Sequence, residues 1–397
     1  MTDVRITTAT ATYIGWGTLK HVFTEADKYK GKILVVSDPV LVKIGVLDQL
    51  TLPLSEKGFS FDVYSDIIPE PEVKTAQQLV NYTRNGNYSL IIGIGGGSAL
   101  DLAKLAAVFT HNPGDVTDYL NLTGTLKLQH KGIPKILIPT TSGTGTEVTN
   151  ISVLALEHSK DVITHDFLLA DVAIVDAQLT VTVPPKVTAA TGADALTHAI
   201  EAYISVNANP YSDALALEAI RLIGGSLKRV VKNGDDKSAR IAMAYGSYLA
   251  GLAFFNAGVG AIHALAYPLG GQFHVAHGDS NALLIPYVLG YIRHTCAERL
   301  ATILTALGYD RSEKTNDDAA SFCVETLATL MKEIEIPETP AGFGIPASAA
   351  KQLAADGIKQ KRLLARCPMQ LTEHDILEIY QAAFTGVIPQ RKAAVLS

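Results

Sequence analysis

The pattern of apolar residues changes at Pro184 and Pro185, and this change divides the chain of 397 residues into two parts. Before it, short β-branched runs alternate with stretches of helical spacing, which is typical of a mostly parallel α/β sheet. After it, strand patterns are hard to find and helical spacing dominates. A chain of this length exceeds one ordinary hydrophobic core. We therefore predict a Rossmann-like α/β domain over residues 1–183 and an all-α domain over residues 184–397.

The predicted elements follow from these runs. Strands are expected at residues 32–37, 61–64, 89–94, 136–138 and 172–175. Helices in the first part are expected at residues 40–54, 75–84 and 99–110. Helices in the second part are expected at residues 187–206, 210–231, 238–255, 259–268, 297–307, 317–333, 347–355 and 372–384.

Composition narrows the class of protein. Hydrophobic residues make up 48% of the chain and charged residues 18%, so a large core is expected and disorder is not. The net charge of −6 and the lack of a dense Lys/Arg run argue against a nucleic-acid partner. The N-terminal sequence has no secretory pattern, and three widely spaced cysteines are typical of a reducing compartment. We expect a cytoplasmic protein.

One long stretch, residues 241–277, contains no Asp, Glu, Lys or Arg. Its length would satisfy a search for a membrane span. It also contains Asn256, Pro268, several glycines and histidines, and it is the only such stretch in the sequence. We interpret it as buried helices around a functional site and expect no membrane partner.

Two polar loops follow predicted strands of the first part. Gly95, Gly96, Gly97 and Ser98 lie between a strand and a helix, where glycines let backbone N–H groups approach a phosphate. Asp101 follows in the first turn of that helix, where a carboxylate would lie near a ribose or nicotinamide amide. An ordinary tight turn with a capping Asp explains the same residues, and the pattern is not the G-x-G-x-x-G fingerprint.

The second loop, residues 139–149, offers the hydroxyls of Thr140, Thr141 and Thr144 to a diphosphate or ribose. Such loops are usually plain turns, but two at the ends of parallel strands indicate a ligand crevice. Asp38 ends the first predicted strand, where a carboxylate favours NAD over NADP; a turn-initiating Asp before Pro39 is the alternative.

The second part contains a candidate metal site. Asp194 and His198 are four residues apart on a predicted helix and therefore share one face. His263 and His277 follow, the latter in a predicted glycine-flanked loop. One carboxylate and three imidazoles suit Fe²⁺ or Zn²⁺, although any single histidine here is better explained as a core residue.

Together these motifs resemble the iron-containing, group III alcohol dehydrogenases. The resemblance rests on four segments that span nearly the whole chain: residues 95–104, 139–149, 192–203 and 263–278. It implies an N-terminal dinucleotide-binding domain, a C-terminal catalytic domain with dehydroquinate synthase-like architecture, and an active site between them. It also implies iron ligands at Asp194, His198, His263 and His277, the cofactor contacts named above, a cofactor-side lysine at Lys160, and a homodimer.

The sequence departs from the family pattern at two places. Tyr267 stands where many members have a histidine proposed for proton exchange. The unperturbed pKa of tyrosine is about 10, which makes it a poor proton shuttle at neutral pH. Glu70 replaces the usual asparagine between Pro69 and Pro71.

We predict a metal-dependent NAD(H) alcohol dehydrogenase or aldehyde reductase that acts on small primary alcohols, diols or aldehydes. A hydroxyacid–oxoacid transhydrogenase or a maleylacetate reductase-like enzyme is the first alternative and would need basic residues for a substrate carboxylate. A dehydroquinate synthase-like lyase would need several phosphate-binding basic residues near the metal, which the uncharged stretch argues against. A non-catalytic NAD-binding module is the third alternative.

Overall fold

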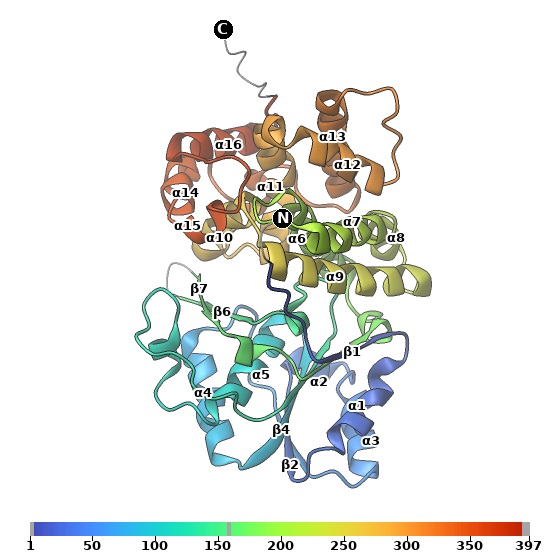
Figure 1. The fold of residues 1–397 in the computed structure, drawn as a ribbon, viewed down its shortest axis with the longest axis vertical. Helices are drawn as coiled ribbons and strands as arrows, with labels where there is room; N and C mark the ends of the chain where they lie inside the picture. Colours follow the sequence, from blue (N-terminus) through green and yellow to red (C-terminus); the bar gives the residue numbers. More distant parts are fainter. Residues whose placement is uncertain (1–3, 157–159, 391–397) are drawn as a thin grey trace. The chain divides into compact units, whose positions relative to one another are not determined.

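The computed structural model describes residues 4–156 and 160–390. Contacts within the chain divide it into two compact units, one spanning Thr7–Val183 and the other spanning Pro184 onward together with the first described residues, 4–6. The first unit is an α/β domain and the second is mostly helical (Figure 1), so the predicted fold class is confirmed.

A six-stranded parallel sheet forms the centre of the α/β unit, with the order β1-β8-β5-β4-β2-β3. Five strands were predicted from sequence, and β1 was missed because its half-buried residues show no clear alternation. The strands are β1 (Ala11–Gly15), β2 (Lys32–Val36), β3 (Phe61–Tyr64), β4 (Tyr88–Gly95), β5 (Lys135–Pro139) and β8 (Val172–Asp176).

Side chains of β2 alternate between two hydrophobic cores, as the pleat of a strand requires. Ile33 and Val35 pack with residues of α1 (His21–Ala26) and α3 (Asp48–Glu56). Leu34 and Val36 pack with residues of α4 (Val73–Asn85) and α5 (Gly97–Phe109) on the opposite face. Helices therefore cover both faces of the sheet (Figure 1), and only the ends of its strands are left open to a ligand.

The expected helix at residues 40–54 was wrong as a single element. It is two helices, α2 (Pro39–Lys43) and α3, because Gly45 adopts a left-handed conformation between them with φ 73°. The sequence prediction also missed an antiparallel hairpin, β6 (Ile151–Ala155) and β7 (Lys160–Thr164).

No strand occurs among residues 184–390. The expected helix at 210–231 is interrupted at Gly225, and the glycine-flanked loop predicted at His277 is instead the start of a helix that the prediction missed. The helices are α6 (Pro185–Ile204), α7 (Pro210–Gly224), α8 (Leu227–Lys232), α9 (Lys237–Ala257), α10 (Ala261–Phe273), α11 (His277–Ile292), α12 (Ala297–Ala306), α13 (Asn316–Glu333), α14 (Ala350–Gly357), α15 (Lys361–Leu364) and α16 (Glu373–Thr385).

The uncharged stretch forms most of α9 and all of α10. Within the described parts of the chain, no single helix is long and apolar enough to cross a membrane. Helices α9 and α10 meet that criterion only as a pair, and the chain bends by 105° between them.

Candidate metal centre and cofactor loops

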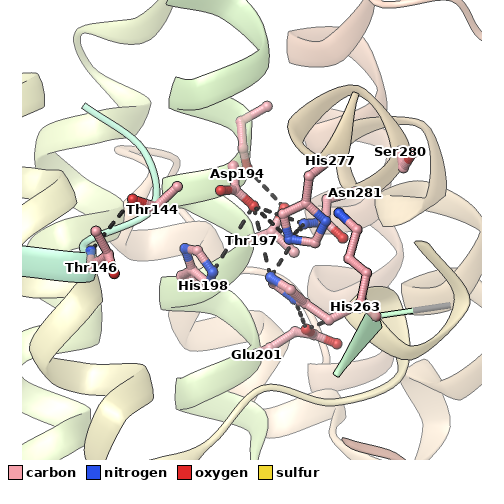
Figure 2. A network of polar contacts seen from close by, with 12 residues as sticks. Thr144, Thr146, Asp194, Thr197, His198, Glu201, His263, His277, Ser280 and Asn281 are labelled. Carbon is pink, nitrogen blue, oxygen red and sulfur yellow. Dashed lines mark hydrogen bonds and ion pairs between the residues drawn. The ribbon is translucent and has the colours of Figure 1, made fainter. Parts of the chain in front are cut away.

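Three helices bring the predicted metal donors together in the helical unit (Figure 2). Helix α6 carries Asp194 and His198 one turn apart, α10 carries His263, and α11 begins with His277. His277 is thus fixed at a helix start, where its backbone is regular, rather than in a loop.

The donor atoms converge on one place. Asp194 Oδ1 lies 3.7 Å from His263 Nε2, 3.8 Å from His277 Nε2 and 4.0 Å from His198 Nε2. Two donors of one tetrahedral ion at a bond length of about 2.1 Å are about 3.4 Å apart, so these separations are close to those of a shared ion. Ligand atoms of Asp194, His263 and His277 all lie within 4.8 Å of one another.

Asn281, one turn after His277 on α11, contacts three of the four donors with one amide nitrogen. Its Nδ2 donates to Asp194 Oδ1 at 2.7 Å and lies 3.2 Å from His263 Nε2 and 3.3 Å from His277 Nε2. Its Oδ1 is buried and has no hydrogen-bond partner among the described residues. A polar group that these residues do not supply would satisfy that oxygen.

The electrostatics of the cluster favour a cation. Burial alone would raise the pKa of Asp194, but nearby His198, His277 and His263, with the Asn281 hydrogen bond, outweigh it and lower the pKa. The carboxylate is therefore ionised at neutral pH. One carboxylate with three imidazoles, all largely shielded from water, is a donor set that fits a divalent iron or zinc ion.

Glu201, two turns after Asp194 on α6, supports His263 from the other side of its ring (Figure 2). Its Oε2 lies 2.6 Å from His263 Nδ1, and both side chains are nearly fully buried, 2% and 3% exposed. Its Oε1 accepts the Ile262 N–H at 2.6 Å.

Aromatic rings surround the donors. Phe254 stacks on His198 with ring centroids 4.3 Å apart, and His198 stacks on His263 at 4.6 Å. Tyr267, one turn after His263 on α10, lies beside His277 with centroids 5.8 Å apart. These rings restrict the donor orientations and give the site an apolar wall.

The predicted cofactor residues lie in the α/β unit, and all except Asp101 and Lys160 lie at or after the carboxyl ends of neighbouring strands. From β2 the chain continues to β3 on one side, and later returns to β4 on the other side of β2. This reversal is the switch point at which open α/β sheets bind ligands. Asp38 follows β2, and Gly95 to Ser98 follow β4.

The glycine loop is shaped by two close approaches. Gly95 has φ 155°, and an added Cβ there would lie 2.7 Å from the Ala99 Cβ and 3.1 Å from Asp38 Oδ2. An added Cβ on Gly97 would lie 2.8 Å from Thr144 Cγ2, so the two predicted loops touch. Gly96, the N-cap of α5, differs from both because nothing lies within 4 Å of its Cβ position.

Asp38 and Thr140 have local structural roles as well. Asp38 Oδ1 accepts the N–H groups of Val40 and Leu41 and so caps α2, while Oδ2 faces Gly95. The Thr140 N–H donates to the Gly95 carbonyl at 3.0 Å, which ties the two loops together. Thr141 is partly exposed next to it.

Asp101 was expected to contact the cofactor, but both of its carboxylate oxygens already have protein partners. Oδ1 accepts from Thr146 Oγ1 and from Lys104 Nζ, and Oδ2 accepts the Val153 N–H. Lys104 is fully buried and also donates to Thr149 and to the Ile151 carbonyl. This network fixes α5, the second loop and β6, and a cofactor role of Asp101 stays a prediction.

Lys160, on β7, pairs with Glu70 at 2.9 Å. Glu70 adopts a positive φ of 55°, and its N–H donates to Ser98 Oγ at 3.2 Å. The glutamate that replaces the usual asparagine therefore links the hairpin lysine to the start of α5.

Sequence reasoning missed Glu201, Asn281 and Lys104. A detectable signal existed for the first two: Glu201 lies seven residues after Asp194, and Asn281 four after His277, so each shares a helix face with a predicted donor. Lys104 stood out only as a charge inside an apolar helix.

The fold and the donor cluster together indicate a metal-dependent enzyme with a nucleotide-binding half. The family model described as "Iron-containing alcohol dehydrogenase" matches residues 9–177, and the model described as "Fe-containing alcohol dehydrogenase family, C-terminal" matches residues 188–384. The chain belongs to the iron-containing alcohol dehydrogenase family and is an oxidoreductase of that family.

Proteins of known name or structure match this chain over nearly its whole length. "Long-chain-alcohol dehydrogenase 1" of Geobacillus thermodenitrificans (strain NG80-2) is 60% identical over 98% of each chain. A solved structure of 1,3-propanediol oxidoreductase is 33% identical, covers 96% of this chain and 100% of its own, and has a TM-score of 0.91. Sulfoacetaldehyde reductase from Bifidobacterium kashiwanohense in complex with NAD⁺ is 26% identical, covers 96% and 99%, and has a TM-score of 0.85.

Proposed function

We propose that Asp194, His198, His263 and His277 hold a divalent iron ion for an NAD(H)-dependent alcohol dehydrogenase or aldehyde reductase. The observation that carries this proposal is the convergence of the four donors, with Asp194 Oδ1 within 4.0 Å of a nitrogen of each histidine. Zinc fits the same donors, and the family description favours iron.

The chemistry that such an ion supplies is Lewis-acid polarisation of an alcohol or carbonyl oxygen. The chain's own residues hold the donors and exclude water. The Asp194 carboxylate provides the negative charge, Asn281 orients it by a hydrogen bond, and the ring of Phe254 covers His198. Tyr267 bears a hydroxyl and lies beside His277, and we assign it to the proton path of the reaction.

We propose that residues 1–183 form the domain that binds NAD and that residues 184–397 form the metal-binding domain. The N–H groups at the start of α5, from Gly96 to Ser98, suit the diphosphate; Thr144 lies beside Gly97, and Thr141 belongs to the same loop as Thr144. Asp38 Oδ2 suits an adenine-ribose hydroxyl and disfavours a 2′-phosphate. Support for NAD itself comes from the sulfoacetaldehyde reductase complex.

We propose primary alcohols, diols and the corresponding aldehydes as substrates. The uncharged α10 and the rings around the donors favour an apolar substrate body. The name of the 60% identical relative extends the proposal to long-chain alcohols, and that of the propanediol enzyme to diols. Steady-state kcat/KM over linear alcohols of increasing length, diols and 2-hydroxy acids tests this. Turnover of the hydroxy acids alone would reject it in favour of a hydroxyacid–oxoacid transhydrogenase.

The metal assignment has its own test. We expect Asp194→Ala to lose bound iron and NADH formation together, measured by elemental analysis and by absorbance at the reduced-cofactor band. Full activity in a metal-free variant would reject the proposed mechanism.

We also propose a cytoplasmic homodimer. Cys296, Cys323 and Cys367 are all buried and unbridged, which is typical of a reducing compartment. The dimer rests on the family resemblance, and light scattering of the purified protein measures it directly.

A further inference from the structure

We infer that Glu201 is a positioning residue that sets the tautomer and the direction of His263 for metal binding. This inference rests on the proposed metal site and goes beyond its four donors. Glu201 is one turn after His198 on α6, and its carboxylate reaches across to α10. It contacts His263 on the ring edge opposite the one that faces Asp194.

The first step is the hydrogen bond to the ring. Glu201 Oε2 lies 2.6 Å from His263 Nδ1. A carboxylate is an acceptor, so a contact this short requires a proton on Nδ1. A neutral imidazole carries one proton, and Nε2 then presents its lone pair. That is the nitrogen that lies 3.7 Å from Asp194 Oδ1 and 3.2 Å from the Asn281 amide. The Asn281 contact fits the same tautomer, because Nε2 without a proton can accept the Asn281 N–H.

The second step concerns the backbone that carries the ring. Helix α10 has no side-chain cap of its own at Gly260. Glu201 supplies one from another helix: Oε1 accepts the Ile262 N–H at 2.6 Å, and Oε2 lies 3.4 Å from the His263 N–H. Both N–H groups lie in the first turn of α10, where the helix itself offers no carbonyl acceptor. An added Cβ on Gly260 would lie 3.3 Å from Glu201 Oε1, which is tighter than ordinary contact, so a glycine here keeps the carboxylate's approach open.

One carboxylate thus fixes both the helix start and the ring of His263. Burial makes both contacts strong, because Glu201 is only 2% exposed and water does not compete for its oxygens. A carboxylate hydrogen-bonded to a metal-binding histidine orients the ring and raises its basicity, and the loss of such a partner typically lowers metal affinity about 10- to 100-fold.

Glu201→Gln separates positioning from mere packing. The glutamine has the same shape, and its carbonyl can still accept the Ile262 N–H. Its NH₂ group then faces His263 Nδ1 and stabilises the tautomer with the proton on Nε2, which cannot bind a metal. The matched control is Asp213→Asn, because Asp213 lies in the same unit and its carboxylate pairs with Arg299 at 2.9 and 3.0 Å rather than with a donor.

The experiment measures Co²⁺ binding to chelator-stripped, full-length protein by competition and by visible absorption. We expect Glu201→Gln to raise the Co²⁺ dissociation constant roughly 10- to 100-fold and to change the cobalt spectrum. Asp213→Asn should leave both close to wild type, even where both variants lower the melting temperature. Unchanged affinity and spectrum in Glu201→Gln would overturn the inference and leave a capping role alone.

Two further arms separate this inference from the metal assignment. If Asp194→Ala binds Co²⁺ as tightly as wild type, the metal site itself is wrong and Glu201 has no donor to position. If Glu201→Gln does not fold, the ¹⁵N shifts of histidine-labelled, stripped wild-type protein report the tautomer of His263. A proton on Nδ1 supports the inference, and a proton on Nε2 overturns it.

Discussion

Gly96→Ala separates a glycine kept for a ligand from glycines kept for packing. Gly96 is the N-cap of α5, with φ −73° and ψ 179°, a conformation that alanine adopts freely. An added Cβ there has no neighbour within 4 Å. The fold therefore gives no steric reason for glycine, whereas a phosphate against the helix start does.

Gly96→Ala should leave the stability of the fold nearly unchanged but weaken NAD binding. A Gly→Ala change at a compatible backbone position stabilises by about 0.4–1 kcal/mol, and alanine is a poorer N-cap than glycine by a similar amount, so the net stability change is about zero. A hydrogen bond to a charged group contributes about 1.5–3 kcal/mol. Loss of one phosphate contact should therefore raise the NAD dissociation constant roughly 10- to 100-fold.

The assay is NAD binding by calorimetry, with the melting temperature measured on the same preparations. Gly93→Ala is the contrasting variant, because its Cβ would lie 2.6 Å from the Ala103 Cβ and 3.1 Å from Leu137 Cδ2. Overpacking there should cost about 1–3 kcal/mol of stability. If Gly96→Ala binds NAD as tightly as wild type, the loop from Gly95 to Ser98 is an ordinary turn and the proposed diphosphate site is wrong.

Three further results are expected. Burial raises the pKa of Glu147 from 4.5 to about 7, because the buried carboxyl group favours its protonated form. The free energy of unfolding therefore falls as the pH rises from about 4.5, where the unfolded chain begins to lose this proton, to about 7, where the folded protein loses it too. Glu147→Gln should therefore gain up to about 3 kcal/mol relative to wild type between pH 5 and pH 8, and equal melting-temperature differences at both pH values would contradict this. Asn281→Ala removes a charge-assisted hydrogen bond to Asp194 and should lower iron affinity about tenfold or more, measured by chelator competition; unchanged affinity would show that Asn281 has only a packing role. Tyr267→Phe should lower kcat about 100-fold at neutral pH if its hydroxyl moves the proton, and a normal kcat would exclude that role.

The sequence was most informative where a residue's neighbours along the chain decide its structure. The strand at residues 61–64 and the helix at 372–384 were predicted to within one residue, because burial periodicity sets both. The helix break at Gly45 depends on a left-handed backbone, which periodicity does not detect. Helix α11 was missed because Gly278 resembles a loop residue. Glycine is required there for packing rather than for a turn, since a Cβ would lie 2.2 Å from the Ala190 carbonyl oxygen of α6.

The donor set was predicted from the sequence, whereas the two residues that support it, Glu201 and Asn281, were missed. Asp194 and His198 share a helix face by spacing alone, His263 and His277 follow within the chain's uncharged stretch, and the resemblance implies all four as ligands. Glu201 acts on His263 across 62 positions of the chain, and Asn281 acts on Asp194 across 87. Contacts at such separations depend on how helices pack, which one sequence pattern does not specify.

The donors come from α6, α10 and α11, so a bound ion would be a cross-link between three segments that are far apart along the chain. A ligand that binds only the folded state stabilises it by mass action, by about 2.7 kcal/mol when its free concentration is 100 times the dissociation constant. The heat resistance of a preparation then depends on its iron loading as well as on its sequence. Two samples of identical chains, one purified with a chelator, would melt at different temperatures, and the difference would measure metal occupancy.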